Sequence, residues 1–564
     1  MAGAWQQDPR TLEAGVMQRI CAASGTMFEV TPQARAFYER LGVPLPTLCP
    51  VERARRRMAF RSVRHLYRRK CAGTHKEIIC LYSADKDLQV FDDAYWWSDN
   101  WSARDYARDF DFNRPFFEQF AELTHAVPRM ATNGSQNENS RYTSYAGWNK
   151  DCYLIFYSDH NRDCFYLSDS FHNHDSIDCA YLQRSELCSQ CVSSENCYNG
   201  RFLLNCKNCS DCWFLSDCVG CKYCFGCVNL HNQEYHIYNE PYTRVEYFEK
   251  LALLNLSSST GIAQQRVKFR DFRAGFPHKY LNGNQNEEVS GDYLVGCKDV
   301  IDSYHVEYSR ECAYLIDCQK CVNCQDMDGW GGAGAELVYE GQTVGERAHS
   351  VMFSSHVWDG ASDIAYSDAC MQSHNLFGCA GLRHAEYCIL NKQYSKDEYR
   401  LFRQKIIGHM QETGEWGEFF PINISPFCYN ETRAYEWYPL SKEEVLGRGG
   451  KWYEPAAGDR PIATLKKVPV NLVDAQESIC DELISCNDCG AAFKIQRAEF
   501  RLYLKQSLPL PDQCHNCRHK ERIATLNPQK LNHVKCFRCA VELLSTFDAK
   551  HKVVCEQCWA DLQR

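Results

Sequence analysis

The sequence predicts a mainly β protein: a narrow, cysteine-lined β-solenoid in two halves, flanked by two copies of a small α+β module. Three observations predict this: a three-residue period of cysteines in mid-chain, a partial return of that pattern, and a similarity between the two ends. The 564 residues, 13% aromatic, suffice for several domains with their own cores. A net charge of −9 disfavours a protein that coats nucleic acid over its whole surface.

The cysteine period occupies the segment from Cys152 to Cys227. Its thirteen cysteines are separated by multiples of three residues, which chance would produce roughly once in half a million tries. A strand has period 2 and a helix 3.6, and packed polyproline helices would need Gly or Pro on the frame. A narrow solenoid remains, and Asp-Cys phrases at 151 and 163 indicate twelve-residue coils. This spacing is similar to that of cysteine-rich insect antifreeze solenoids.

Three interpretations of the solenoid cysteines stay open. The thiols pack as small apolar groups, or they form a soft-metal or redox ladder, or they form disulfides inside the solenoid. The members of the ladder would be Cys206, Cys209, Cys212, Cys218, Cys221, Cys224 and Cys227.

A second solenoid half follows. Cys297, Cys312, Cys318, Cys321 and Cys324 keep a three-residue frame, a glycine-rich insertion over 329–345 breaks it, and Cys370, Cys379 and Cys388 resume in another. Residues 226–247 match 378–399 at a shift of 152. We expect helices over 242–256 and 394–413 to cap the two halves.

The two ends of the chain align at a shift of 465 residues, for example Cys21 with Cys486 and Tyr38 with Tyr503. In the C-terminal copy a knuckle, a strand over 493–495, a helix over 499–505 and a basic helix opened by Cys514 resemble a zinc ribbon or treble clef. Four chelating pairs of thiolates suit two tetrahedral zinc ions, and full protein ligation predicts a structural role. The predicted ligands are Cys486, Cys489, Cys514, Cys517, Cys536, Cys539, Cys555 and Cys558.

The N-terminal copy has lost ligands. Ser24, Glu52 and Thr74 occupy the positions of Cys489, Cys517 and Cys539. We expect this copy to bind no zinc and to fold on its apolar residues. A three-thiolate site of Cys21, Cys49 and Cys71 is the alternative.

A basic segment over 53–70 holds nine Arg or Lys residues with interleaved aromatics. Basic residues beside zinc modules commonly contact phosphates, so nucleic acid or a ribosomal surface is one predicted partner. A solvated helix face that balances acidic neighbours is the alternative. The cationic residues are Arg53, Arg55, Arg56, Arg57, Arg61, Arg64, Arg68, Arg69 and Lys70.

The predicted domains follow from these patterns. They are a degenerate zinc-ribbon-like module (1–90), an aromatic and helical connector (91–130), the first solenoid half with its capping helix (131–260), the second (261–413), an aromatic loop-rich connector (414–480) and the zinc-binding module (481–564).

Compartment and catalysis are predicted from what the sequence lacks. The first residues show no basic region followed by an apolar stretch, as a signal peptide would, and the sequence has no run of 18 apolar residues that could span a membrane. Cys-x-x-Cys pairs favour thiolates on metal over disulfides, so we expect a cytoplasmic protein. No phosphate loop, dinucleotide fingerprint or nucleophile elbow is present. His172 and His174 near Asp169 and Asp175 are a weaker candidate for a surface metal or acid–base site.

Several phrases cover much of the chain: Pro-Leu-Pro-x-x-Cys, Tyr-Trp-Trp-Ser-Asp, the run over 108–120, Glu-Trp-Gly-Glu-Phe-Phe-Pro and Tyr-Asn-Glu-Thr. They resemble a family of large, uncharacterised cysteine-rich zinc-ribbon proteins of candidate-phyla bacteria, which implies no particular activity. The sequence thus predicts a non-enzymatic zinc-binding scaffold or adaptor for an unidentified protein partner. A soft-metal or redox protein using the solenoid thiols is the alternative.

Overall fold

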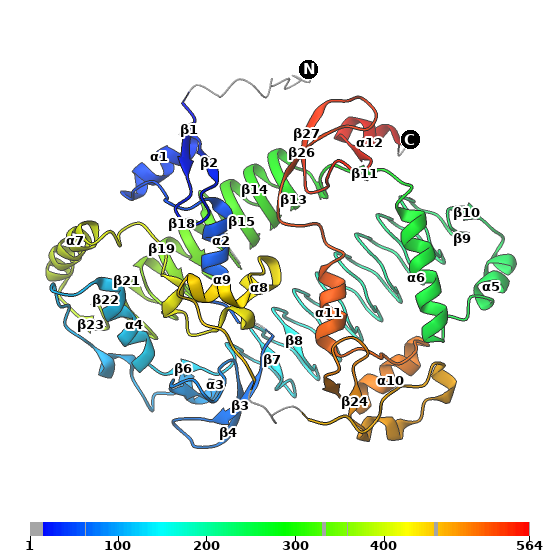
Figure 1. Cartoon of the computed structure of the whole chain (residues 1–564), viewed down its shortest axis with the longest axis horizontal. Helices are drawn as coiled ribbons and strands as arrows, with labels where there is room; N and C mark the ends of the chain where they lie inside the picture. The colour runs from blue at the N-terminus through cyan, green and yellow to red at the C-terminus, as the bar shows by residue number, and fades with distance from the viewer. Residues whose placement is uncertain (1–14, 63, 330–333, 358, 456–460, 563–564) are drawn as a thin grey trace.

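Two β-solenoids lie side by side in the computed structural model, which describes residues 15–62, 64–329, 334–357, 359–455 and 461–562 (Figure 1). The first half is a ladder of single bridges twelve residues apart, from Ser135–Gly147 to Phe225–Ile237. It includes β7 (Thr143–Ser144), β8 (Ile155–Phe156) and β9 (His236–Ile237), which pairs with β10 (Glu240–Pro241). The predicted mainly β solenoid is confirmed.

A three-residue unit explains the period of the first half. The first residue of each unit has positive φ, as at Asp151 (φ 53°) and Leu154 (φ 50°). The second residue, Cys152 or Ile155, is buried inside the coil. The third, such as Tyr153, bridges to the next coil. Because Asn and Asp tolerate the left-handed region best, they recur at the first position.

Hydrogen bonds inside the coil explain why Ser, Asn and Cys occupy the inward position. The Ser158 hydroxyl donates to the carbonyl of Phe156 at 2.8 Å and accepts from the backbone N–H of Ser170 at 3.0 Å. The Asn161 side chain accepts likewise from the N–H of Asn173 at 3.0 Å. An inward residue thus gives the next coil an acceptor for a buried N–H that would otherwise be unpaired.

The second half is a sheet in which most neighbouring strands are parallel. Its coils lengthen where the cysteine frame breaks: Gln325 pairs with Tyr339, fourteen residues on, and Tyr339 with Met352, thirteen on. Further along the sheet the spacing is twelve residues again, as in the pairing of Leu376 with Cys388. The strands are β12 (Gly283–Asn284), β13 (Glu287–Val295), β14 (Lys298–Glu307), β15 (Arg310–Gln319), β16 (Cys321–Val322), β17 (Gln325–Asp328), β18 (Ala335–Gln342), β19 (His349–Ser355), β20 (Ser362–Ala365), β21 (His374–Phe377), β22 (Glu386–Ile389) and β23 (Lys392–Gln393).

The two solenoids run in opposite directions along their shared seam. Contacts pair early residues of one half with late residues of the other: Tyr145 with His356, Tyr157 with Thr343, Tyr181 with His305, and Asn205 with Asn282. Arg433 lies in this seam and binds both Asp169 and Asp317.

The end modules have matching elements at the shift of 465 residues. Helices α1 (Pro32–Leu41) and α2 (Pro50–Met58) correspond to α10 (Arg497–Gln506) and α11 (His515–Ile523). Strands β3 (Tyr67–Lys70) and β4 (Glu77–Cys80) correspond to β26 (Asn532–Lys535) and β27 (Glu542–Ser545). The hairpins of β1 (Met17–Ile20) with β2 (Met27–Val30) and β24 (Ile484–Ser485) with β25 (Ala492–Phe493) correspond more loosely, and β28 (Val553–Val554) and α12 (Glu556–Leu562) complete the C-terminal copy.

The second helix of each module, α2 or α11, docks on the solenoid half that is more distant from it in sequence, and the molecule has an approximate two-fold symmetry (Figure 1). Arg53 on α2 binds Asp326 at 3.0 Å, and Arg518 on α11 binds Asp178 at 2.9 Å. These arginines are 465 residues apart and the aspartates 148, so the two contacts are copies of each other.

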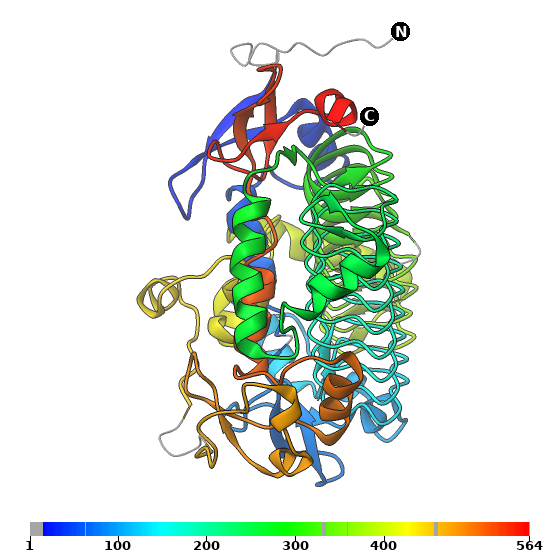
Figure 2. The same ribbon diagram turned by 90° about the vertical axis from the view of Figure 1, so that its right-hand side faces the viewer.

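The remaining elements cap the solenoids or cover them. The two predicted capping helices are present as α5 (Arg244–Ala252) and α7 (Lys396–Glu412). The sequence did not predict α6 (Ser259–Arg273), which lies beside α11 (Figure 2) and crosses the boundary expected at 260. The connectors contain β5 (Val90–Phe91), α3 (Asp93–Trp97), η1 (Ala103–Tyr106), α4 (Phe116–Ala126), β6 (Arg129–Met130), β11 (His278–Lys279), η2 (Ile422–Ile424), η3 (Tyr429–Glu431), α8 (Arg433–Trp437), α9 (Lys442–Gly447), η4 (Leu472–Asp474) and η5 (Glu477–Asp481).

Candidate metal centres

The first group of four cysteines joins a turn and a helix start. Cys486 and Cys489 lie on the turn between β24 and β25, and Cys514 and Cys517 lie at the start of α11. Their four Sγ atoms all lie within 4.8 Å of one another. The backbone N–H of Cys514 donates to Sγ of Cys486 at 3.2 Å, which orients that sulfur toward the others.

The second group repeats this arrangement. Cys536 and Cys539 lie between β26 and β27, and Cys555 and Cys558 lie at the start of α12. Their Sγ atoms also lie within 4.8 Å of one another, with 3.7 Å between Cys539 and Cys555. The backbone N–H of Cys555 donates to Sγ of Cys536 at 3.4 Å, as in the first group.

Backbone dipoles favour one thiolate in each group. Burial raises the pKa of Cys486, but N–H groups of Cys489 and Cys514 outweigh it and lower this pKa to about 7. The pKa of Cys536 is lowered to about 6 in the same way, by N–H groups of Cys539 and Cys555. Each group therefore offers one sulfur that loses its proton near neutral pH. Four converging sulfurs could hold a metal ion, and soft cations prefer such ligands.

The N-terminal copy presents a different set of side chains. The Ser24 hydroxyl lies 4.0 Å from Sγ of Cys49, where the C-terminal copy has a second thiol. Glu52 binds Arg448 at 2.8 Å instead of facing the sulfurs. Cys71 packs in a different apolar cluster from Cys21 and Cys49. Among the described residues these three thiols form no group within 4.8 Å of one another.

The seven cysteines of the predicted soft-metal ladder all point into the first solenoid and are buried. Cys218, Cys221, Cys224 and Cys227 fill the four inward positions of one coil. Each sulfur donates to the carbonyl two residues earlier, as Cys212 does to Ser210 at 3.1 Å. In the part of the chain that the structure describes, these sulfurs form no group of three within 4.8 Å. They pack as the apolar interpretation expects.

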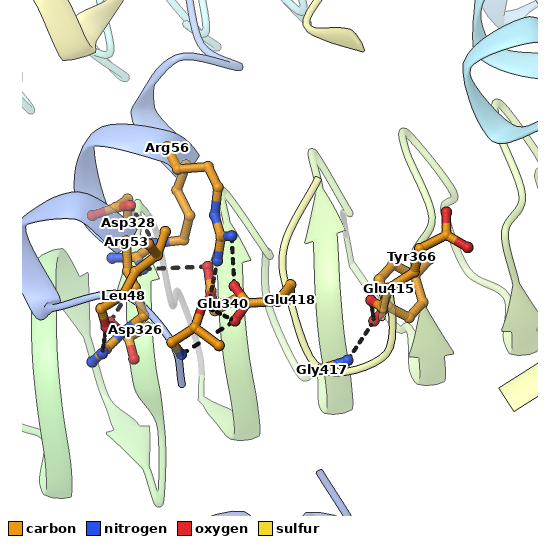
Figure 3. A network of polar contacts seen from close by, with 12 residues as sticks. Leu48, Arg53, Arg56, Asp326, Asp328, Glu340, Tyr366, Glu415, Gly417 and Glu418 are labelled. Carbon is orange, nitrogen blue, oxygen red and sulfur yellow. Dashed lines mark hydrogen bonds and ion pairs between the residues drawn. The ribbon is translucent and has the colours of Figure 1, made fainter. Parts of the chain in front are cut away.

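The basic segment is largely interior, which sequence reasoning did not foresee. Figure 3 shows α2 over strands of the second half, where Arg56 contacts Glu340 at 2.6 Å and Glu418 at 2.7 Å. Arg57 binds Asp328 at 2.7 Å and is fully buried.

Other members of the segment are also engaged. Arg61 is fully buried against the ring of Tyr157, with 3.3 Å from its guanidinium carbon to the ring centre. Arg55 binds Glu52, Arg64 lies over the ring of Phe156, and Arg69 donates to the carbonyl of Leu88 at 2.8 Å. Of the nine cations, Arg68 and Lys70 are exposed. The expected solvated helix face is therefore wrong, although the acidic neighbours exist. Nucleic-acid contact stays a prediction, with few free cations to support it.

Histidines on α11 and on the first solenoid make other contacts. His519 on α11 is buried and lies 2.6 Å from the Glu436 carboxylate. Asp163, His174 and Asp175 form a third group within 4.8 Å, but Lys505 already binds Asp175 at 2.6 Å. His172 belongs to a stack with His160 instead.

Within the described ranges, no helix combines the length and apolar character needed to cross a bilayer. A scan against models of known protein families returns no match, and a search of curated proteins returns none either.

Proposed function

We propose that this protein is a zinc-binding scaffold in which two structural zinc ions fix the C-terminal module across the pair of solenoids. The observation that carries the proposal is the convergence of eight cysteines into two groups of four sulfurs, each within 4.8 Å. Zinc is the metal that such tetrahedral thiolate sets bind most commonly in proteins. Because each site supplies four protein ligands, no position is left for a reacting water.

The location of the two groups supports a structural role. The first group fixes the start of α11, whose Arg518 and Arg522 bind Asp178 of the first solenoid at 2.9 Å. In the second group, Cys555 and Cys558 directly follow β28, which pairs with β11 at the entry to the second solenoid. Metal binding would therefore stabilise contacts with both halves, since the free energy of binding becomes free energy of folding.

Elemental analysis of protein purified without oxygen tests the proposal. We expect about two zinc ions per chain. Cys514→Ser should remove one of them and Cys555→Ser the other, while Cys480→Ser, a buried cysteine outside both groups, should retain both. Protein that is metal-free, or ligand variants that keep full zinc, would contradict the proposal.

One observation favours a second candidate, a soft-metal site inside the first solenoid. Cys218, Cys221, Cys224 and Cys227 fill the inward positions of one coil, and Cys206, Cys209 and Cys212 fill three of the four in the coil before it, so seven buried thiols line one stretch of the interior. A monovalent soft cation such as Cu(I) would suit such a site. A third metal equivalent that Cys221→Ser removes and Cys514→Ser retains would establish it. Its absence from protein supplied with Cu(I) would exclude it.

A further inference from the structure

A cavity of about 660 Å³ lies between the first solenoid, α6, α11 and the loop before β28. Phe202 and Phe214 stack on each other in its wall, with ring centres 4.5 Å apart, and Phe269 of α6 packs against Phe214. Leu204 and Val267 add aliphatic surface. A volume of 300–1,000 Å³ with apolar walls is typical of small-molecule sites.

The same cavity has a cationic rim. Arg266, Arg270, Arg273, Lys550 and Lys552 line it, and Glu521 is the acidic residue among the lining side chains. Glu521 pairs with Arg266 at 2.9 Å, and Arg270 pairs with its neighbour Asp271. The Nε atom of Arg273 is buried without a hydrogen-bond partner. The cavity therefore combines an apolar wall with surplus positive charge.

The duplication identifies a missing negative charge. Arg57, the counterpart of Arg522, lies within ion-pair distance of Asp326, Asp328 and Glu340. For Arg522 the first carboxylate is retained as Asp178.

The other two carboxylates are replaced. The positions of Asp328 and Glu340 correspond, through the coil register, to Ala180 and Gln190 in the first solenoid. Arg522 is 3% exposed, lines the cavity, and has neither its Nε nor its Nη2 atom hydrogen-bonded. A buried guanidinium with free donors favours an anion from outside the chain.

We propose that this cavity binds a small organic anion whose phosphate, sulfonate or carboxylate pairs with Arg522 and Arg273 and whose apolar body packs against Phe214 and Phe269. The anion takes the place of the two carboxylates that the other copy supplies. Helix α6, which forms one wall, follows the capping helix α5, whereas no helix of comparable length follows α7 in the described residues 413–455. The site therefore occurs where the two-fold symmetry is broken.

Fluorescence titration with anilinonaphthalene sulfonate, an aromatic anion, tests the proposal on the full-length protein. Two variants address the cavity: Arg273→Gln removes a rim cation, and Val267→Glu places a carboxylate at the half-exposed wall. Each should weaken saturable binding roughly 10- to 100-fold, because Arg273→Gln removes a charge-assisted hydrogen bond and Val267→Glu adds a like charge beside the anion. Arg400→Gln, an exposed change on α7, is the matched control and should bind as wild type.

Competition identifies the ligand class. Displacement of the probe by adenosine monophosphate indicates an aromatic phosphate, and displacement by decanoate indicates an alkyl carboxylate. The uncharged analogues adenosine and decanol should displace the probe at concentrations at least tenfold higher than the anions need, because they lack the ion pair with the arginines. Equal competition by the neutral compounds, no saturable binding to wild type, or unchanged binding by both cavity variants would overturn the proposal. Zinc content measured on the same samples keeps this outcome separate from the scaffold proposal.

Discussion

The hydrogen-bond ladder inside the first solenoid makes a quantitative prediction for Ser170→Ala. The Ser170 hydroxyl is fully buried, donates to the carbonyl of Ser168 at 2.8 Å, and accepts from the backbone N–H of Leu182 at 3.1 Å. Alanine removes one atom, so the packing loss is small. The larger effect is a buried N–H without an acceptor, which costs about 1–3 kcal/mol, and a carbonyl with one partner fewer. We expect a local loss of about 2–3 kcal/mol.

Residue-resolved hydrogen exchange measures this loss where it arises, because a chain with several domains does not unfold in one step. The Leu182 amide should exchange roughly 30- to 150-fold faster in Ser170→Ala, the equivalent of 2–3 kcal/mol. Ser170→Cys should lose less than half as much, because a thiol can serve the same role: Cys179 accepts from the Cys191 N–H at 3.4 Å. Ser210→Ala, at a bridging position of a coil instead of an inward one, is the control.

Two results would refute this reasoning. One is a Leu182 amide that exchanges at the wild-type rate in Ser170→Ala, since the hydroxyl would then not be its acceptor. The other is a cysteine variant as damaged as the alanine variant. In that case thiols and hydroxyls would not be interchangeable on the inward frame, and the mixture of Cys, Ser and Asn would need another explanation.

Three further predictions concern buried charge and backbone space. Burial raises the pKa of Glu499 from 4.5 to about 7, so the folded state holds a proton that the unfolded state releases, and stability falls as pH rises from about 5 to 7. In thermal melts, Glu499→Gln should remove up to ~3 kcal/mol of this pH-dependent loss of stability. An unchanged pH slope in the variant would contradict the prediction. Arg433→Met leaves two buried aspartates unpaired and should cost about 3–5 kcal/mol in a thermal melt, most of it recovered when both aspartates become Asn. Gly291→Ala would place Cβ 1.8 Å from a backbone oxygen of the next coil, so soluble yield and melting temperature should fall sharply, whereas Gly447→Ala, with open space around it, should behave as wild type.

Much of the fold could be predicted because its determinants are local in sequence. The three-residue period of inward residues such as Cys152 and Ile155 follows from one left-handed residue per unit, which repeats without reference to the rest of the chain. The candidate metal ligands could be predicted in the same way, since Cys486 and Cys489 lie in one Cys-x-x-Cys motif. The loss of ligands in the N-terminal copy is visible in substitutions such as Ser24 at the position of Cys489. Register changes near Gln325 could be suspected from the broken frame, but their sizes could not.

The sequence by itself therefore determined the solenoid, its two halves, the duplicated modules and the eight cysteines, whose four Cys-x-x-Cys pairs form two groups of four. Only the tertiary structure decided that α2 and α11 dock on the more distant halves, that Arg57 is neutralised instead of exposed, and that α6 closes a cavity beside Arg522. The physical reason is range. Periodicity and chelating spacing act within a few residues, whereas the partner of a charge is chosen by packing: Arg53 meets Asp326 across 273 residues of chain, and no local pattern distinguishes a guanidinium that will be buried there from one that faces solvent.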